Sequence, residues 1–281
     1  STAYYYFAIV VTRIGLTTNN VNTSIGEMEL LGIPEYDPDA HGTDVIIRSV
    51  PNVPNTDWLE VYYDGQDYTS MPSTVTDKSG NGATGTPNGG VGFDTEYKAF
   101  TFDGVDDIIT VSNVGNGTGE WIHSSSVWFK RSSDTSEYAE AIWHLGTQSA
   151  GQASSLITIG DELALDIWST RVGVVDFVKN DQWYHVCGVY RGGSWNSTNV
   201  DLYVNGVKIK TTVVDADTVN LQGTTLSIGG RDATTDLWHG SIANFRLFSK
   251  ALNADQVREL YEYDAPRFGH RQNLVALHKG N

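Results

Sequence analysis

The sequence predicts an all-β fold: a jelly-roll sandwich of two antiparallel sheets with one short C-terminal amphipathic helix. Three observations carry this prediction. From Asp57 onward, short runs of strand-forming residues follow one another, turn residues separate them, and only one run has clear helical periodicity. The composition agrees, because 29 glycines, 11% aromatic residues and 40% hydrophobic residues in 281 positions suit a β-rich chain with a real core.

The predicted order of parts begins with a hairpin-like segment and a linker. Residues 1–32 hold two short strand candidates, YYYFAIVVTRIG and SIGEMELLG, which need a further strand or a partner because two strands alone are marginal in water. Residues 33–56 contain four prolines with several Asp and Asn residues, which is typical of a linker. The sandwich is predicted over residues 57–264, and a C-terminal tail over 265–281.

Two glycine-containing stretches are predicted to be turns. GNGATG (Gly80–Gly85) matches the G-x-G-x-x-G pattern of dinucleotide-binding sites, which works only where a buried strand leads into a helix N-terminus. Here Pro87 and more glycines follow, so consecutive tight turns are predicted instead. In DLYVNGVKIK, Asn205 and Gly206 stand between alternating strands, which predicts a hairpin with a type I′ turn.

The helix is predicted in NADQVRELYEYD. Asn253 is a good N-cap residue, and Gln256 follows at the spacing of a capping box. Val257, Leu260 and Tyr261 fall on one face of this helix, which we expect to pack on the sandwich.

Charge and cysteine content restrict the classes of partner. The formal net charge of -16 repels nucleic acid and anionic membranes, so neither is expected as a partner. No apolar run approaches the about 18 residues that span a bilayer, so no membrane insertion is expected. Cys187 is the single cysteine, which excludes an internal disulfide, and its strand-forming neighbours predict a buried, inert thiol.

The order of motifs resembles a known family. TDKSGNGATGT, KAFTFDGVDDIITV, SSVWFKR, DQWYHVCGVYRGG, VDLYVNGVKI, LSIGGR and HGSIANFRLFSKALNADQVRELYE follow one another as in concanavalin A-like, laminin-G/pentraxin-type jelly rolls. The resemblance covers roughly residues 57–264. The segment FAIVVTRIG…SIGEMELLG is similar to the closing strands of a discoidin-type galactose-binding domain, and the tandem arrangement resembles modules in surface proteins of large algal viruses.

Members of this superfamily include glycanases, so catalytic patterns matter. The glucanase pattern Glu-x-Asp-x-x-Glu is absent, and the acidic clusters are predicted in turns, whereas glycoside hydrolysis needs two carboxylates about 5 to 10 Å apart in a cleft. Jelly-roll lyases use Arg, His and Tyr on neighbouring strands, for which His144, His185, Arg246 and Tyr190 are the candidates. Without a matching local signature, core or rim positions are favoured for these four, and the protein is predicted not to be an enzyme.

The resemblance also implies calcium as the expected cofactor. Calcium takes several oxygen ligands from loops. Asp77 and Asn81 supply oxygens within one turn, and Asp64, Asp103 and Asp106 are expected nearby.

Sugar recognition uses an exposed aromatic ring beside amides and carboxylates. Trp128 and Trp183 occupy strand positions that the family buries, so both are assigned to the core. Trp195 instead stands in the polar loop RGGSWNSTN and is the first candidate for stacking on a sugar. The predicted ligand-binding set is Trp195, Asn196, Asn199, Trp238, Asp236, Trp121 and His123. For the three tryptophans, packing against a loop is the open alternative.

The preferred hypothesis is a non-catalytic carbohydrate-binding or adhesion module of a larger extracellular or virion-surface protein, with cell-surface or wall glycans as partners. Two alternatives stay open: a structural module that only mediates assembly through strand pairing, and a polysaccharide-cleaving lyase or glycosidase whose site has no recognised signature. The unsupported N-terminal hairpin and the apolar tail lead us to expect a homo-oligomer, such as a trimer, or a part of a larger multidomain chain.

Overall fold

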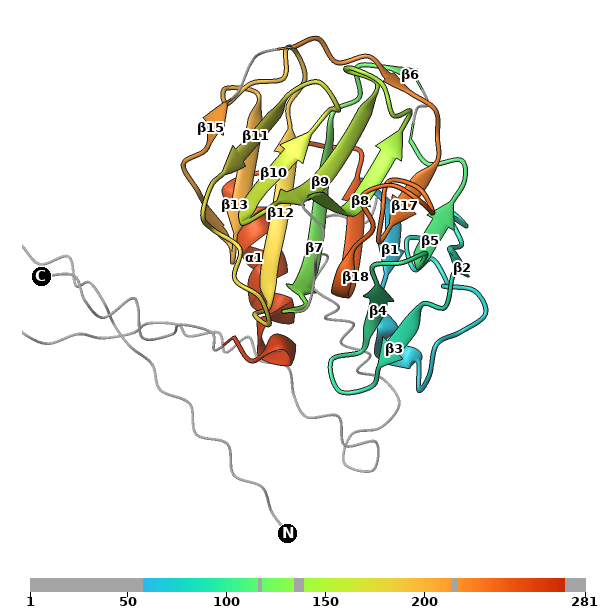
Figure 1. Cartoon of the computed structure of the whole chain (residues 1–281). Helices are drawn as coiled ribbons and strands as arrows, with labels where there is room; N and C mark the ends of the chain where they lie inside the picture. The colour runs from blue at the N-terminus through green and yellow to red at the C-terminus, as the bar shows by residue number, and fades with distance from the viewer. Residues whose placement is uncertain (1–57, 116–117, 134–138, 214–216, 271–281) are drawn as a thin grey trace, which may run out of the picture. The chain divides into compact units, whose positions relative to one another are not determined.

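The structure is a computed structural model that describes residues 58–270 except 116–117, 134–138 and 214–216 (Figure 1). The predicted hairpin segment 1–32, the linker 33–56 and most of the tail therefore lie outside the described residues. Within the described part the predicted fold class is confirmed, because two large antiparallel sheets face each other and one α-helix follows the last strand. None of the described helices has the length and apolar character required to span a bilayer.

The first sheet contains the strand that closes the fold. Its centre is β18, which pairs with β7 on one side and with β4 and β1 on the other, so both ends of the described chain meet in one sheet. Its strands, in order across the sheet, are β14 (Val207–Lys208), β13 (Val200–Val204), β12 (Tyr184–Tyr190), β7 (His123–Arg131), β18 (His239–Phe248), β4 (Ala99–Asp103) and β3 (Gly92–Asp94), with β1 (Leu59–Tyr63) also on β18.

The second sheet lies in front of the first in Figure 1 and is built around β8 and β9. A two-stranded ladder of β6 (Thr118–Gly119) and β16 (Leu221–Gln222) completes the β structure. The strands of the second sheet, in order, are β15 (Thr212–Val213), β11 (Arg171–Val174), β10 (Glu162–Asp166), β9 (Ala153–Ile159), β8 (Ala139–Gly146), β17 (Leu226–Ile228), β5 (Ile108–Val111) and β2 (Thr86–Asn88).

The main core fills the space between the two sheets. Period-two alternation places one side chain of each pair inward, so the inner faces meet as a continuous apolar layer. Phe129, Trp143, Leu156 and Phe245 are among its buried members, each 2% exposed or less. Burial of such a side chain contributes roughly 1.5–3 kcal/mol to the free energy of unfolding. We call the face of each sheet that points away from this core its outer face.

The C-terminal helix covers the outer face of the first sheet. Helix α1 (Ala254–Asp264) begins at the predicted capping box, in which the Gln256 N–H donates to Asn253 Oδ1 and the Asn253 N–H donates to Gln256 Oε1, both at 2.9 Å. Val257 and Leu260 are buried against Cys187, as predicted, in a cluster beneath the helix. The short turn η3 (Ala265–Phe268) continues this cover over Trp128 and Trp183.

The predicted turns are confirmed. Asn205 and Gly206 both have positive φ, 50° and 78°, which is the type I′ geometry expected between β13 and β14. The stretch Gly80–Gly85 leads into β2 and not into a helix, so it cannot present helix-terminal amides to a pyrophosphate. Cys187 is fully buried, and this burial raises the pKa of its thiol, which makes it unreactive at neutral pH.

Candidate functional site

Three of the predicted sugar-binding residues come together, but inside the protein. Trp121 stacks on His123 with ring centroids 5.1 Å apart, and His123 in turn lies 5.7 Å from Tyr190. Tyr190 contacts Trp195, which is 0% exposed. The expectation that Trp195 is an exposed loop tryptophan is therefore wrong: its polar neighbours in sequence lie at the surface while its ring completes an aromatic cluster at one end of the core.

The other four predicted sugar-binding residues are not part of this aromatic cluster. Asn196 Oδ1 accepts the backbone N–H of Thr198 at 2.9 Å, and the Asn199 amide donates to the Ser194 carbonyl at 2.8 Å, so both side chains stabilise their own loop. Trp238 is fully buried and meets Phe129 edge to face. Asp236 differs from these residues, because its side chain is 26% exposed and takes part in the polar network of Arg231 that is described below.

The candidate lyase residues do not form one site. His144 lies on the outer face of the second sheet, where its Nδ1 is 2.8 Å from Ser155 Oγ. His185 and Arg246 lie beneath helix α1 on the first sheet. Tyr190 belongs to the core between the sheets. Since these groups occupy three different environments, they cannot act on one bound substrate.

The predicted metal ligands Asp77 and Asn81 are occupied by the turn itself. Asp77 Oδ1 accepts the N–H groups of Tyr62 and Ser79, and its Oδ2 accepts the Ser79 hydroxyl and the Ala83 N–H, at 2.7 to 3.1 Å. Burial opposes ionisation of Asp77, but these hydrogen bonds outweigh it and lower the pKa of the carboxyl. The Asn81 amide donates to the Leu59 carbonyl at 2.6 Å. Both side chains thus have a structural role without a cation.

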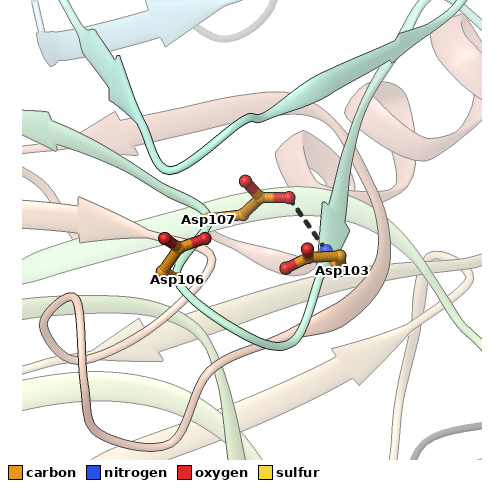
Figure 2. A group of neighbouring side chains, drawn as sticks. All are labelled: Asp103, Asp106 and Asp107. Carbon is orange, nitrogen blue, oxygen red and sulfur yellow. Dashed lines mark hydrogen bonds between the residues drawn. The ribbon is translucent and has the colours of Figure 1, made fainter.

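A different acidic turn brings three carboxylates together. Asp103, Asp106 and Asp107 each place one oxygen within 4.8 Å of the others (Figure 2). Asp107 Oδ2 accepts the Asp103 N–H at 2.9 Å, whereas its Oδ1 is buried and has no hydrogen-bond partner. Burial, reinforced by the charges of Asp103 and Asp106, raises the pKa of Asp107. A cation between the three carboxylates would relieve their mutual repulsion, so the oxygen-only donor set fits a hard divalent ion.

A row of polar side chains crosses the outer face of the second sheet. The strand register pairs Asp166 of β10 with Ser155 of β9, Ser155 with His144 of β8, His144 with Ser227 of β17, and Ser227 with Thr110 of β5. Paired residues lie on the same face, so these five form one continuous line across five strands. The next row along the same face is apolar and includes Ala164, Ile157 and Ala141.

Arg231 connects this row to the loop that follows β17. Its Nη2 donates to Asp166 Oδ2 at 2.9 Å, its Nη1 to Ser155 Oγ at 3.0 Å, and its Nε to Asp236 Oδ2 at 2.6 Å. The Arg231 carbonyl accepts the Ser227 hydroxyl at 3.1 Å. Arg231 and Asp166 are both buried, and such a pair is tolerated because each charge has several hydrogen-bond partners.

Trp168 covers the guanidinium and reaches the surface. The Arg231 Cζ lies 4.7 Å from the centre of its ring, while 40% of the residue is exposed. The Trp168 N–H donates to Asp166 Oδ2 at 2.9 Å, and its backbone adopts φ 75°, a left-handed conformation that is rare for a large side chain. The local fold therefore holds an aromatic ring outward in a strained conformation.

Only a few side chains of this polar network are accessible to a ligand. His144 is 2% exposed, and burial, assisted by the charge of Arg231, lowers its pKa to about 4, so the ring is neutral at pH 7. Asp232, partly exposed, accepts the Gln148 amide at 2.6 Å. The groups with exposed surface are thus Trp168, Asp236, Asp232 and Gln148, which we call the Trp168 site: an aromatic ring on Arg231, a carboxylate bonded to the same guanidinium, and a carboxylate–amide pair that begins at the next residue of the loop.

Sequence reasoning identified Asp236 in this site and missed the others. By its residue pattern the run ELALDIWS favours a strand that continues through Trp168, whereas β10 ends at Asp166. The available signal is the Asp two residues before the Trp, because an Asp side chain that accepts the N–H two positions on forms a turn. The contact between Asp166 and Arg231 joins residues that are 65 positions apart, so no local sequence pattern predicts it.

Comparison with solved structures supports the fold. The ligand-binding domain of botulinum neurotoxin serotype D, in complex with N-acetylneuraminic acid, is similar with a TM-score of 0.58 at 20% identity, over 76% of this chain and 54% of that one. The receptor-binding domain of the botulinum neurotoxin C/D mosaic gives a TM-score of 0.58 at 20% identity, over 76% and 55%. This chain thus spans about half the length of these toxin domains.

A third similar structure is domain 4 of AbnA, an extracellular arabinanase from Geobacillus stearothermophilus, in complex with arabinotriose. Its TM-score is 0.52 at 18% identity, and the alignment covers 73% of this chain and 98% of that domain. No curated protein sequence matches the chain significantly. The family profile described as the concanavalin A-like lectin/glucanases superfamily matches residues 103–258. Because this match spans more than half of the 281 residues, the protein belongs to the concanavalin A-like lectin/glucanase superfamily.

Proposed function

We propose that the protein is a non-catalytic carbohydrate-binding module and that glycans bind at the Trp168 site. The observation that carries this proposal is Trp168 itself, a tryptophan with 40% of its surface exposed in a left-handed backbone conformation. Such a conformation costs of order 1–2 kcal/mol for a residue with a side chain. The contact of the ring with Arg231 offsets part of this cost, but it does not require the other part of an apolar ring to face solvent, so we infer that the exposed part serves recognition.

The chemistry around the ring suits a sugar. One side of the indole is occupied by Arg231, and the exposed part is available to the C–H face of a pyranose or furanose ring. Asp236 and Asp232 provide acceptors for hydroxyl groups, and Gln148 provides an amide. The platform is rigid before binding because the Trp168 N–H and Arg231 both bond to Asp166, which reduces the ordering cost of binding.

The similar structures support the same class of ligand. AbnA domain 4 is described with arabinotriose and the neurotoxin domain with N-acetylneuraminic acid, so proteins of this fold hold sugars of different chemistry. A catalytic role has less support, because His144 and Ser155 are both buried. Asp166 and Asp236 are bonded to one guanidinium, where they act as partners of Arg231.

The proposal is tested on a glycan array followed by calorimetry of the best ligand. Trp168→Ala is expected to weaken binding about five- to thirtyfold, since loss of ring stacking removes about 1–2 kcal/mol. The matched control is Tyr263→Ala, which removes an aromatic ring that is 54% exposed on helix α1, and its binding should equal that of the wild type. Equal binding by Trp168→Ala and the wild type would contradict the proposed site. Release of sugar products by the wild type would restore the enzyme alternative.

Calcium is the second proposal, for the acidic turn of Asp103, Asp106 and Asp107. It is favoured by the three carboxylates, which each place one oxygen within 4.8 Å of the others, and by the burial of Asp107, whose Oδ1 has no hydrogen-bond partner. Calcium bound there would offset most of the negative charge of the turn and raise the melting temperature by mass action. Asp106→Asn should abolish that shift, while Glu259→Gln, an equivalent charge change on an exposed position of α1, should preserve it. A calcium shift that survives Asp106→Asn would assign the ion elsewhere.

Location and assembly are proposed from the sequence resemblance. An extracellular or virion-surface setting suits a glycan-binding module with a net charge of -16. A homo-oligomer, such as a trimer, would add avidity to weak single-site binding. Sedimentation of the full chain at micromolar concentration tests this, and a clean monomer would refute it.

A further inference from the structure

The charges around the Trp168 site are unbalanced. Three carboxylates, of Asp166, Asp232 and Asp236, belong to the site or to its support, against one cation, Arg231. Arg171 is on the neighbouring strand β11, but its guanidinium forms a salt bridge to Glu162 at 2.8 Å, so that pair adds no net charge. The remaining groups, Gln148 and Thr110, are neutral. The site therefore has a formal charge of about −2 at neutral pH.

Arg231 is not available as an anion receptor. Its Nε, Nη1 and Nη2 atoms are each bonded within the protein, to Asp236, Ser155 and Asp166 respectively, and its side chain is only 6% exposed. Because three of its five N–H groups are used in this way and its side chain is almost fully buried, an acidic sugar could reach the guanidinium only by displacing one of these partners or the Trp168 ring. Removing one partner of a buried ion pair costs several kcal/mol, which exceeds what one new carboxylate contact returns.

We infer that the Trp168 site selects uncharged glycans and rejects glycans that carry carboxylate or sulfate groups. This inference rests on the proposed function and specifies its ligand class. The exposed carboxylates of Asp232 and Asp236 are acceptors, and the hydroxyl groups of a neutral sugar are the matching donors. The net charge of -16 acts in the same direction, because it repels polyanionic polysaccharides before they reach the site.

The test compares each neutral glycan bound on an array with its counterpart oxidised to the uronic acid at C6, at low salt. The wild type should bind the neutral member at least tenfold more tightly. Asp232→Asn should narrow this ratio by about threefold, the effect of one unit charge at roughly 6 Å in water. Its carboxamide keeps an oxygen for the Thr234 N–H, which Asp232 Oδ1 accepts at 2.8 Å. The bond that Asp232 Oδ2 accepts from the Gln148 amide is lost for the neutral and the acidic glycan alike, so the ratio of the two affinities remains the readout. Glu259→Gln is the distant charge control and should leave the ratio unchanged.

The outcomes separate the two proposals. Binding of the acidic member as tightly as the neutral one would overturn the inference while the glycan-binding function stands. Equal narrowing by Asp232→Asn and Glu259→Gln would also overturn it, because the selection would then come from total charge and not from this site. Binding of no glycan, neutral or acidic, would overturn the proposed function and the inference together.

Discussion

The outer faces of the two sheets contain the same combination of side chains, but the helix covers these side chains on the first sheet and they are partly exposed on the second. On the first sheet, Arg246 donates to Asp264 at 2.7 Å and its Cζ lies 4.4 Å from the Tyr62 ring, while His185 is 2.9 Å from Ser126 Oγ. On the second sheet, Arg231 bonds to Asp166 beneath the Trp168 ring, and His144 is 2.8 Å from Ser155 Oγ. Each face thus has a buried arginine, an acidic partner, an aromatic ring and a His–Ser pair.

The difference lies in what covers each arginine. Asp264 is the last residue of helix α1, so the network on the first sheet attaches the helix and is sealed by it. On the second sheet the aromatic ring is 40% exposed, and the second carboxylate, of Asp236, comes from a loop. Buried polar networks alone therefore do not identify a functional site in this protein. We base the proposed site on the exposed end of the network on the second sheet.

The largest expected effect comes from removing the two arginines. Arg246→Ala should lower the free energy of unfolding by about 3–5 kcal/mol, since it leaves the buried carboxylate of Asp264 without its partner. Arg231→Ala should cost somewhat less, about 2–4 kcal/mol, because Asp236, one of its two carboxylate partners, is 26% exposed and regains water when the arginine is removed. Urea unfolding measures both, with Arg258→Ala on the exposed side of α1 as the control near zero. Equal losses would remove the distinction between a sealed and an open face.

The two buried histidines, one on each outer face, should make the stability of the protein depend on pH. Burial lowers the pKa of His185 to about 3 and that of His144 to about 4, whereas the unfolded chain has a value near 6.5. Below pH 6.5 the unfolded state therefore binds more protons than the folded state, and stability falls as pH falls until the folded value is reached. From pH 7 to 5 each histidine should cost roughly 2 kcal/mol.

Unfolding measured at pH 7, 5 and 4 checks this. His185→Asn and His144→Asn should each reduce the loss between pH 7 and pH 5. Between pH 5 and pH 4 the contribution of His144 should level off before that of His185, whose folded pKa is the lower one. A pH dependence that neither substitution changes would mean that other groups carry it.

The smallest expected effect is a difference between two substitutions at Trp168. Glycine adopts φ 75° without strain and alanine does not, so Trp168→Gly should be more stable than Trp168→Ala by about 1 kcal/mol. Both variants should lose glycan binding, because both lack the ring. Thermal unfolding with a binding assay checks this pair. An alanine variant as stable as the glycine variant would show that the backbone at Trp168 relaxes, which weakens the argument from strain.

The sequence alone determined the features that depend on residues close together along the chain. The Asn205–Gly206 hairpin, the Asn253–Gln256 capping box and the turns of Gly80–Gly85 are confirmed, because φ preferences and side-chain caps act over two to four residues. The order of short strands predicted the sandwich for the same reason. Period-two alternation is a local property that any packing of the two sheets must respect.

Only the tertiary structure decided which aromatic rings are exposed and which polar groups meet. Trp195 lies in a polar loop and is buried, while Trp168 follows an apolar strand and is exposed. Both outcomes depend on distant partners: Trp195 on the core that its loop covers, and Trp168 on Arg231. The row from Asp166 to Thr110 requires the register of five strands, which is established by pairing across the sheet and which no short segment contains.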